Sequence, residues 1–97
     1  MRLSFHKKVY SDIDTIMEYY EKAATQQLAD EFYDELRFHF QRAVRQPERF
    51  LIRERDIRRT NLLRFPYHFL FRVVGDSVRI LVVRHNRRHP SFGSKRQ

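Results

Sequence analysis

The sequence predicts an α+β domain in which two helices pack on one face of an antiparallel sheet. The chain has 97 residues, enough for one modest hydrophobic core. Helical patterns occupy the first half, and strand patterns dominate the second half. The expected order is an N-terminal strand, a helical hairpin and a three-strand antiparallel meander. We expect a single domain over residues 1–97, with residues 91–97 as a flexible C-terminal tail.

The N-terminal segment predicts a short strand followed by a helix. Residues 3–9 alternate in side-chain character as a half-buried strand does. Ser11 or Asp12 is suited to cap the N-terminus of a helix. Beyond the cap, apolar residues recur with the i, i+3, i+4, i+7 spacing of one buried stripe, namely Ile13, Ile16, Met17 and Tyr20. This stripe favours core positions for its methionine and aromatic side chains.

A second helical pattern runs from about Gln26 to Gln46, and Pro47 ends it. The residues that face inward are Leu28, Phe32, Leu36, Phe40 and Ala43 or Val44. Neither glycine nor proline separates the two patterns near Ala24, so one continuous helix is the alternative. We prefer a helical hairpin, because two antiparallel helices would cover a sheet face and one long helix would not.

The segment after Pro47 predicts a connector, a strand and a corner. Residues 48–55 are mostly polar and charged, as in a connector. Strand character resumes at Ile57 and continues through Leu63. Pro66 restricts Phe65 to extended backbone and favours a turn or corner before the next strand.

The most informative segment is a predicted hairpin over Tyr67–Val83, with Gly75-Asp76 as its turn. Glycine at the first central position suits a type II′ turn, whose twist matches the flanking strands. Placing Val74 opposite Ser77 sets the register. The face predicted to be buried carries Tyr67, Phe69, Phe71, Val73, Val78, Ile80, Val82 and the stem of Arg84. The face predicted to be open carries His68, Leu70, Arg72, Arg79, Leu81, Val83 and His85.

This register places Arg72 directly across from Arg79. Like charges in that relation destabilise a sheet by on the order of a few tenths of a kcal/mol or more. An anion-binding surface would tolerate the pair. The alternative is a solvated outer face with the two side chains splayed apart.

Charge is distributed unevenly along the chain. Residues 1–46 contain seven Lys/Arg and eight Asp/Glu, net −1, whereas residues 47–97 contain thirteen and four, net +9. Arginine dominates the second half, and its planar fork favours bidentate binding of phosphate or carboxylate. The distribution therefore predicts a nucleic acid or an acidic protein as partner. The alternative is an arginine content that reflects genomic base composition.

Several classes of site are excluded by composition. Without cysteine, neither a disulfide framework nor a thiolate zinc site is available, and a reducing cytosol is compatible with the chain. His85 and His89 have an i, i+4 spacing that brings metal ligands together only on a helix, so we predict no metal site. With only Gly75 and Gly93, no nucleotide-cofactor loop is present, and we predict no cofactor. No long apolar run occurs, so we expect a soluble, unprocessed, cytoplasmic protein without a membrane partner.

Taken in order, several segments resemble the RelE/ParE toxin superfamily of type II toxin–antitoxin modules. They are the first strand, the helical hairpin ending at Pro47, the Arg64-Phe65-Pro66-Tyr67 corner, the Gly75-Asp76 hairpin, Val78-Arg79-Ile80-Leu81 and His85-Asn86-Arg87-Arg88-His89-Pro90. The resemblance covers nearly the whole chain. It implies a small basic toxin that inhibits growth and is neutralised by a cognate acidic antitoxin in a toxin–antitoxin hetero-oligomer.

The resemblance implies one of two targets. ParE-like members poison DNA gyrase without hydrolysing RNA, whereas RelE-like members cut messenger RNA on the ribosome. Arg59 and Asn61 fall near two basic positions of the RelE-like pattern, and His68 and Arg87 fall near two later ones. Asn61 replaces a basic residue, and Phe92 stands about where a C-terminal tyrosine is expected. These departures favour the ParE-like function.

If the chain is a RelE-like endoribonuclease, the resemblance and the chemistry imply His68, His85 and Arg87 as catalytic residues. Attack of a 2′-hydroxyl on its phosphate needs a base, an acid and cationic stabilisation, and histidine suits both proton roles near neutral pH. The candidate residues for phosphate or antitoxin binding are Arg59, Arg72, Arg79, Arg87 and Arg88. The alternative for both histidines is a surface position beside an antitoxin site.

A non-toxic basic module that binds nucleic acid is the third hypothesis, because arginine and aromatic residues interleave over residues 58–92. Most of these aromatics, notably Phe69 and Phe71, fall on the face predicted to be buried. A stacking platform needs exposed aromatic rings, so this hypothesis is the least favoured.

Overall fold

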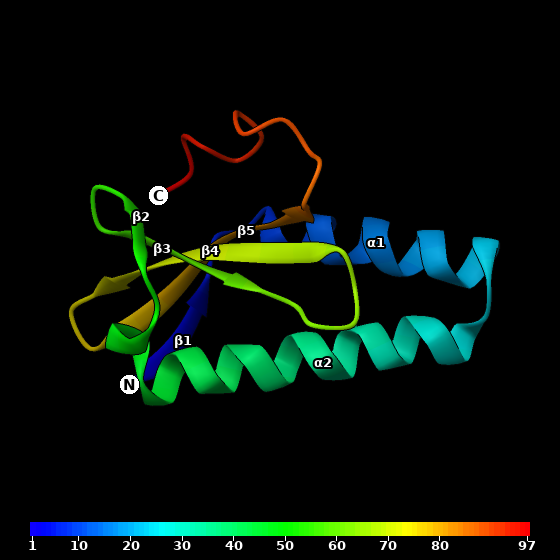
Figure 1. The fold of residues 1–97 in the computed structure, drawn as a ribbon, viewed down its shortest axis with the longest axis horizontal. Helices are drawn as coiled ribbons and strands as arrows, with labels where there is room; N and C mark the ends of the chain where they lie inside the picture. The colour runs from blue at the N-terminus through cyan, green and yellow to red at the C-terminus, as the bar shows by residue number, and fades with distance from the viewer.

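The computed structural model describes residues 1–97 and confirms the α+β class, with two helices packed on a five-stranded sheet (Figure 1). The elements are β1 (Arg2–Phe5), α1 (Val9–Ala23), α2 (Gln26–Arg45), the 3₁₀ turn η1 (Pro47–Arg49), β2 (Ile52–Glu54), β3 (Ile57–Asn61), β4 (Tyr67–Val74) and β5 (Ser77–His85). The strands lie side by side in the order β1-β5-β4-β3-β2.

The sheet is mixed and larger than the predicted three-strand meander. β3, β4 and β5 are antiparallel neighbours, as expected. The predicted connector over residues 48–55 contributes the short strand β2, which pairs with β3. β1 pairs in parallel with β5, from Arg2 opposite Ser77 to Phe5 opposite Ile80. Both added strands cover edges of the meander that would otherwise expose unpaired backbone groups.

The helices form the predicted hairpin, with one correction at the start of α1. The strand ends at Phe5, before the predicted limit, and α1 begins at Val9 instead of at Ser11 or Asp12. The reason is burial, since Val9 is 0% exposed in the first turn of α1. Thr25 separates the helices by capping α2, with its Oγ1 accepting a hydrogen bond from the backbone N–H of Leu28 at 3.0 Å.

The turn of the last hairpin has the predicted type II′ geometry. Gly75 has a φ of +60°, and Asp76 has no positive φ. The predicted register holds from Val74 opposite Ser77 to Phe71 opposite Ile80. Arg72 therefore lies opposite Arg79, as predicted.

Beyond Phe71 the predicted register is wrong, because β5 contains a bulge at Leu81. Leu70 pairs with Val82, so that Leu81 is an extra residue without a partner on β4. A bulge of one residue exchanges the faces of all residues that follow it.

Four residues of β5 therefore lie on the opposite face of the sheet from the one predicted. Val83 and His85 pair with Phe69 and Tyr67 on the face toward the helices, not on the open face. Val82 and Arg84 lie on the opposite face, not on the face toward the helices.

The core lies between the helices and this face of the sheet. Its fully packed members are Val9, Ile16, Phe32, Leu36, Phe40, Ala43, Leu62, Phe65, Tyr67, Phe69, Phe71, Val78, Ile80 and Val83. The ring of Phe40 lies 4.8 Å from that of Phe69, and Phe32 lies 5.5 Å from Phe65. Burying each large apolar side chain contributes about 1.5–3 kcal/mol, which makes this layer the main source of stability.

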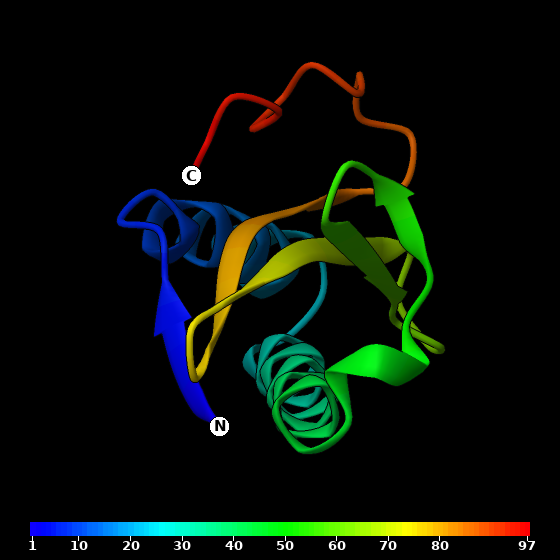
Figure 2. The ribbon, with the colours of Figure 1, turned by 90° about the vertical axis from the view of Figure 1, so that its left-hand side faces the viewer.

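The chain end covers part of the opposite sheet face. Figures 1 and 2 both place the coil after β5 on the other side of the sheet from α2. A Cβ atom on Gly93 would lie 2.6 Å from Cγ2 of Val82, and Gly93 has a φ of +78°. Glycine is therefore needed at this position. The contact explains why Val82 is fully buried although it faces away from the helices.

Beyond the end of β1, the ion pair between Asp12 and Arg96 satisfies backbone groups at the edge of β5. The backbone N–H of Val83 donates to Oδ2 of Asp12 at 3.1 Å. Arg96 donates to both oxygens of Asp12, at 2.6 and 3.1 Å, and to the carbonyl of Leu81 at 3.2 Å. The side chains of Asp12 and Arg96 are only 4% and 11% exposed. The pair thereby ties α1, β5 and the chain end together.

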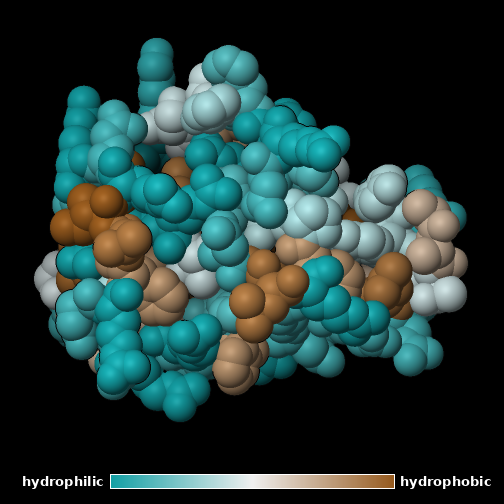
Figure 3. Space-filling model, in the orientation of Figure 1, coloured by the Kyte–Doolittle hydropathy of each residue, from teal (hydrophilic) through white to brown (hydrophobic).

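The outer surface is mainly hydrophilic. Figure 3 shows one face of the molecule, on which hydrophobic side chains form small, separate patches. Leu51 and Leu63 are the most exposed large apolar residues, at 75% and 85%. Neither helix has the length and apolar character needed to cross a bilayer.

Glu35 on α2 anchors the corner between β3 and β4. Its Oε2 accepts hydrogen bonds from the backbone N–H of Leu63 at 2.6 Å and from Nε2 of His39 at 3.0 Å. Its Oε1 accepts from the backbone N–H of Arg64 at 3.2 Å. One carboxylate thus satisfies two backbone donors of the corner and one ring nitrogen of a buried histidine.

We expect Glu35→Gln to destabilise the fold by about 1–3 kcal/mol, because the amide loses the charge and offers only one acceptor oxygen to these donors. Urea unfolding followed by circular dichroism measures the change. Asp34→Asn is the matched control, since Asp34 is exposed on the same helix. Equal stability of the two variants would contradict the anchoring role.

Candidate functional site

Arg72 and Arg79 lie opposite each other, but each is bound to a different partner. Arg72 donates two hydrogen bonds to Oδ2 of Asp56, at 3.1 and 2.7 Å. Arg79 donates to the carbonyls of Gln97 at 2.9 Å and Phe5 at 3.2 Å. These partners hold the two guanidinium groups apart, as in the splayed alternative. A role of either arginine in binding phosphate or antitoxin stays a prediction.

Three other arginines surround His68 on the sheet face away from the helices. We call Arg53, Arg59 and Arg84, which lie on β2, β3 and β5, the arginine cluster. None of the ion pairs in the structure involves them. Burial lowers the pKa of Arg59 and of Arg84, and neighbouring arginines lower both further. Positive charges gathered without a carboxylate attract an anionic ligand.

His68 is buried in this cluster with both ring nitrogens occupied. Nε of Arg84 donates to Nε2 of His68 at 2.9 Å, so Nε2 holds the lone pair. Nδ1 therefore carries the proton, which it donates to Oδ1 of Asn86 at 2.8 Å. Burial lowers the pKa of His68 to about 4; the bond to Asn86 opposes this shift, and Arg59 and Arg84 add to it. The imidazole is neutral near pH 7, and its basic nitrogen is not free.

Arg84 links this site to the chain end. Its Nη1 donates to the carbonyls of Pro90 at 3.0 Å and Phe92 at 2.7 Å. The ring of Phe92 lies 4.1 Å from the guanidinium carbon of Arg88 and 5.1 Å from that of Arg96. Residues 90–96 therefore cover Arg84 from above the sheet.

His85 lies on the face toward the helices and does not meet His68. Its ring is 5.0 Å from that of Tyr67, and its Nδ1 accepts a hydrogen bond from the backbone N–H of Arg87 at 3.0 Å. With Arg84 and Arg88 it lines a hollow of about 480 Å³, whose other lining residues include Ser11, Thr15 and Tyr19. The two proposed proton-transfer residues are therefore separated by the sheet.

The predicted site residues thus fall in three places. Arg72 and Arg79 lie near the hairpin turn, Arg59 lies with His68 in the arginine cluster, and His85, Arg87 and Arg88 lie at the exit of β5. Sequence reasoning missed Arg53 and Asn86 and misplaced Arg84. A signal was present, because four consecutive apolar residues over 80–83 break strand alternation and indicate burial on both faces.

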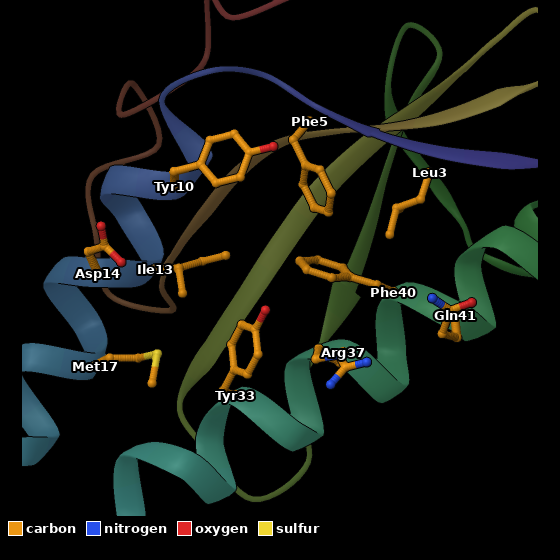
Figure 4. Close-up of a pocket in the computed structure, with 10 residues that line it drawn as sticks. All are labelled: Leu3, Phe5, Tyr10, Ile13, Asp14, Met17, Tyr33, Arg37, Phe40 and Gln41. Carbon is orange, nitrogen blue, oxygen red and sulfur yellow. The ribbon is translucent and has the colours of Figure 1, made fainter. Parts of the chain in front are cut away.

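A separate groove of about 440 Å³ lies between β1, α1 and α2 (Figure 4). In Figure 4, Ile13 and Met17 of α1 face Tyr33 and Phe40 of α2 across this space, and Phe5 of β1 lies at one end. The remaining lining residues are Leu3, Tyr10, Asp14, Arg37 and Gln41. An apolar floor with a polar rim fits an amphipathic segment of a protein partner.

The depressed pKa of His68 makes stability depend on pH. Between about pH 6.5 and pH 4 the unfolded chain binds a proton on this residue that the folded chain does not, so stability falls as pH falls. From pH 7 to pH 5 we expect His68 to contribute a loss of about 2 kcal/mol. His68→Gln keeps two polar contacts but removes this loss. Urea unfolding at both pH values tests it.

His89→Gln is the control for this experiment, because His89 is exposed beyond β5. The control should show the same difference in free energy of unfolding between pH 7 and pH 5 as the wild type. An unchanged difference in His68→Gln would show that the pH dependence arises elsewhere.

Comparison with known proteins confirms the resemblance to the RelE/ParE superfamily. The family model for the ParE toxin of type II toxin–antitoxin system, parDE, matches residues 3–90. No curated protein matches the chain. A solved structure described as "Chromosomal ParDE TA system from P. aeruginosa" has a TM-score of 0.78 and 22% sequence identity, covering 88% of this chain and 95% of that chain. This structural likeness concerns the fold. Because the family model extends from β1 through the exit of β5, the chain belongs to the ParE toxin family and is a type II toxin.

Proposed function

We propose that this toxin inhibits growth by binding DNA gyrase and does not cleave RNA. ParE-like members of the superfamily act in this way, and the ParE family model covers most of the chain. The observation that carries the choice is the state of His68. Its basic nitrogen accepts a hydrogen bond from Arg84, and its pKa is lowered to about 4, chiefly by burial.

A ribonuclease needs a base and an acid that reach the same phosphate. A general base must lie within about 2.6–3.2 Å of the proton that it removes. His68 faces one side of the sheet beneath the chain end, and His85 faces the other side. This arrangement favours a binding function over acid–base catalysis by this pair.

One observation favours the alternative, ribosome-dependent cleavage of messenger RNA. Arg53 and Arg59 of the arginine cluster lack carboxylate partners and keep exposed surface, so they would suit a phosphate-rich ligand. In that alternative His68, His85 and Arg87 would be the catalytic residues. Both targets can be tested in one set of experiments.

We expect purified toxin to inhibit supercoiling by gyrase, and induced expression to arrest growth with transcripts intact. The double variant His68→Gln, His85→Gln should still arrest growth at no more than about twice the dose of wild-type toxin. Circular dichroism checks that the variant is folded. Mapping of messenger-RNA ends checks for cleavage. Codon-phased cuts that disappear in the double variant would overturn the gyrase proposal and support the ribonuclease.

The proposed neutralising partner is an acidic antitoxin with an amphipathic segment in the groove of Figure 4. Apolar side chains from β1, α1 and α2 supply its floor, and the toxin carries a net charge of +8. Opposite charge would speed association, while the apolar floor would provide most of the affinity.

Tyr10→Glu should weaken antitoxin binding at least tenfold, because it places a carboxylate at the rim of the groove. Tyr19→Glu is a matched control, since the two tyrosines are 60% and 59% exposed on the same helix and Tyr19 lies outside the groove. Titration calorimetry with the protein encoded beside the toxin gene measures both affinities. Equal affinities would exclude this groove as the docking site.

A further inference from the structure

We propose that the end of α2 is a second binding surface, which contacts the phosphate backbone of duplex DNA. This helix-end patch consists of Arg42, Arg45 and Arg49 with the aromatic residues Phe38 and Phe50. It lies outside the groove of Figure 4 and shares no residue with the arginine cluster. The inference does not depend on gyrase as the target.

The three arginines gather around one hollow at the end of α2. Arg42 and Arg45 lie three residues apart in the last turn of α2, and Arg49 lies in η1 and lines the same hollow. One strand of a duplex presents a phosphate about every 3.4 Å along the axis, so neighbouring phosphates can contact neighbouring arginines of the patch.

The charges of the patch are not compensated within the protein. Arg42, Arg45 and Arg49 are exposed, and none takes part in an ion pair. Elsewhere, Arg72 and Arg96 do pair with carboxylates. The negative end of the α2 dipole favours basic residues in the last helical turn by about 0.3–1 kcal/mol each. That effect does not account for Arg49, which follows the helix.

Two aromatic rings lie beside Arg42, the first arginine of the patch. The guanidinium carbon of Arg42 lies 5.9 Å from the ring of Phe38 and 5.9 Å from the ring of Phe50. Phe38 is 55% exposed, so its ring is accessible at the surface beside Arg42. An arginine in contact with aromatic rings loses less conformational freedom when it binds a phosphate.

The residues that line the patch favour DNA over an acidic peptide. The hollow among these side chains has a volume of about 780 Å³ and is lined by three arginines and a glutamine, with Phe38 and Phe50 as its apolar residues. Such a surface offers charge and hydrogen-bond donors to a backbone of phosphates. The apolar floor of the protein lies in the groove between α1, α2 and β1.

Fluorescence anisotropy with a labelled 20-base-pair DNA duplex, from 50 to 200 mM salt, tests the proposal on the full chain. The triple variant R42A/R45A/R49A should bind at least tenfold more weakly at 50 mM salt. Because each lost phosphate contact lowers the slope of log affinity against log salt by about 0.9, the slope should fall by about 2.7. Thermal unfolding confirms that the variant is folded.

The control K7A/K8A/K95A removes the same charge from three exposed lysines outside the patch. It should keep the wild-type slope. Equal slopes for the two triple variants, or an unchanged slope for R42A/R45A/R49A, would overturn the proposal. Tighter binding of a polyglutamate peptide, or of an RNA duplex of the same length, would replace DNA by that ligand. Supercoiling assays are separate, so a failure here leaves the gyrase proposal to its own test.

Discussion

The bulge at Leu81 is the constraint on which the arrangement of the sheet depends. Before it, β4 and β5 follow the register set by the Gly75-Asp76 turn; after it, every residue of β5 changes face. Val83 then joins the core under the helices, and Arg84 meets His68 on the other side. The composition of both surfaces follows from this one extra residue.

The bulge also explains why the chain end lies over the sheet. Val82 turns away from the helices and needs a cover, which Gly93 provides by close contact. At the same edge, Asp12 and Arg96 satisfy backbone groups of Val83 and Leu81. A buried ion pair is costly to break, by about 3–5 kcal/mol when one partner is removed, so the chain end contributes to stability as well as covering Arg84. The flexibility of residues 91–97 stays a prediction.

This small toxin carries three distinct surfaces, one apolar and two rich in arginine. Apolar side chains gather in the groove between the helices and β1, where a protein partner would bury them. Arginines without carboxylate partners gather at the cluster around His68 and at the end of α2. The groove and the helix-end patch both lie along α2 but share no lining residue, so the proposed antitoxin and the proposed DNA contact would use different side chains.

Much of the fold was predictable because it depends on local patterns. The stripe from Leu28 to Phe40 indicates the buried face of α2, and Gly75 indicates a type II′ turn. The predicted strand over residues 3–9 was too long, since alternation alone does not reveal that Val9 is buried in a helix. The pairing of β1 with β5 joins the two ends of the chain, so it has no local signal. β2 pairs with the adjacent β3, but it has only three residues, too few for a clear strand pattern.

By itself, the sequence determined the α+β class, the helical hairpin, the arginine-rich second half and the resemblance to a toxin superfamily, since each depends only on the type and spacing of residues. Only the tertiary structure decided which residues meet. Whether His68 lies with His85 or with Arg84 depends on a one-residue shift in an apolar run, and both registers bury apolar side chains. Packing of the chain end against one face and of α1 against the other selects between them. That selection is a property of contacts between distant segments, and no local pattern contains it.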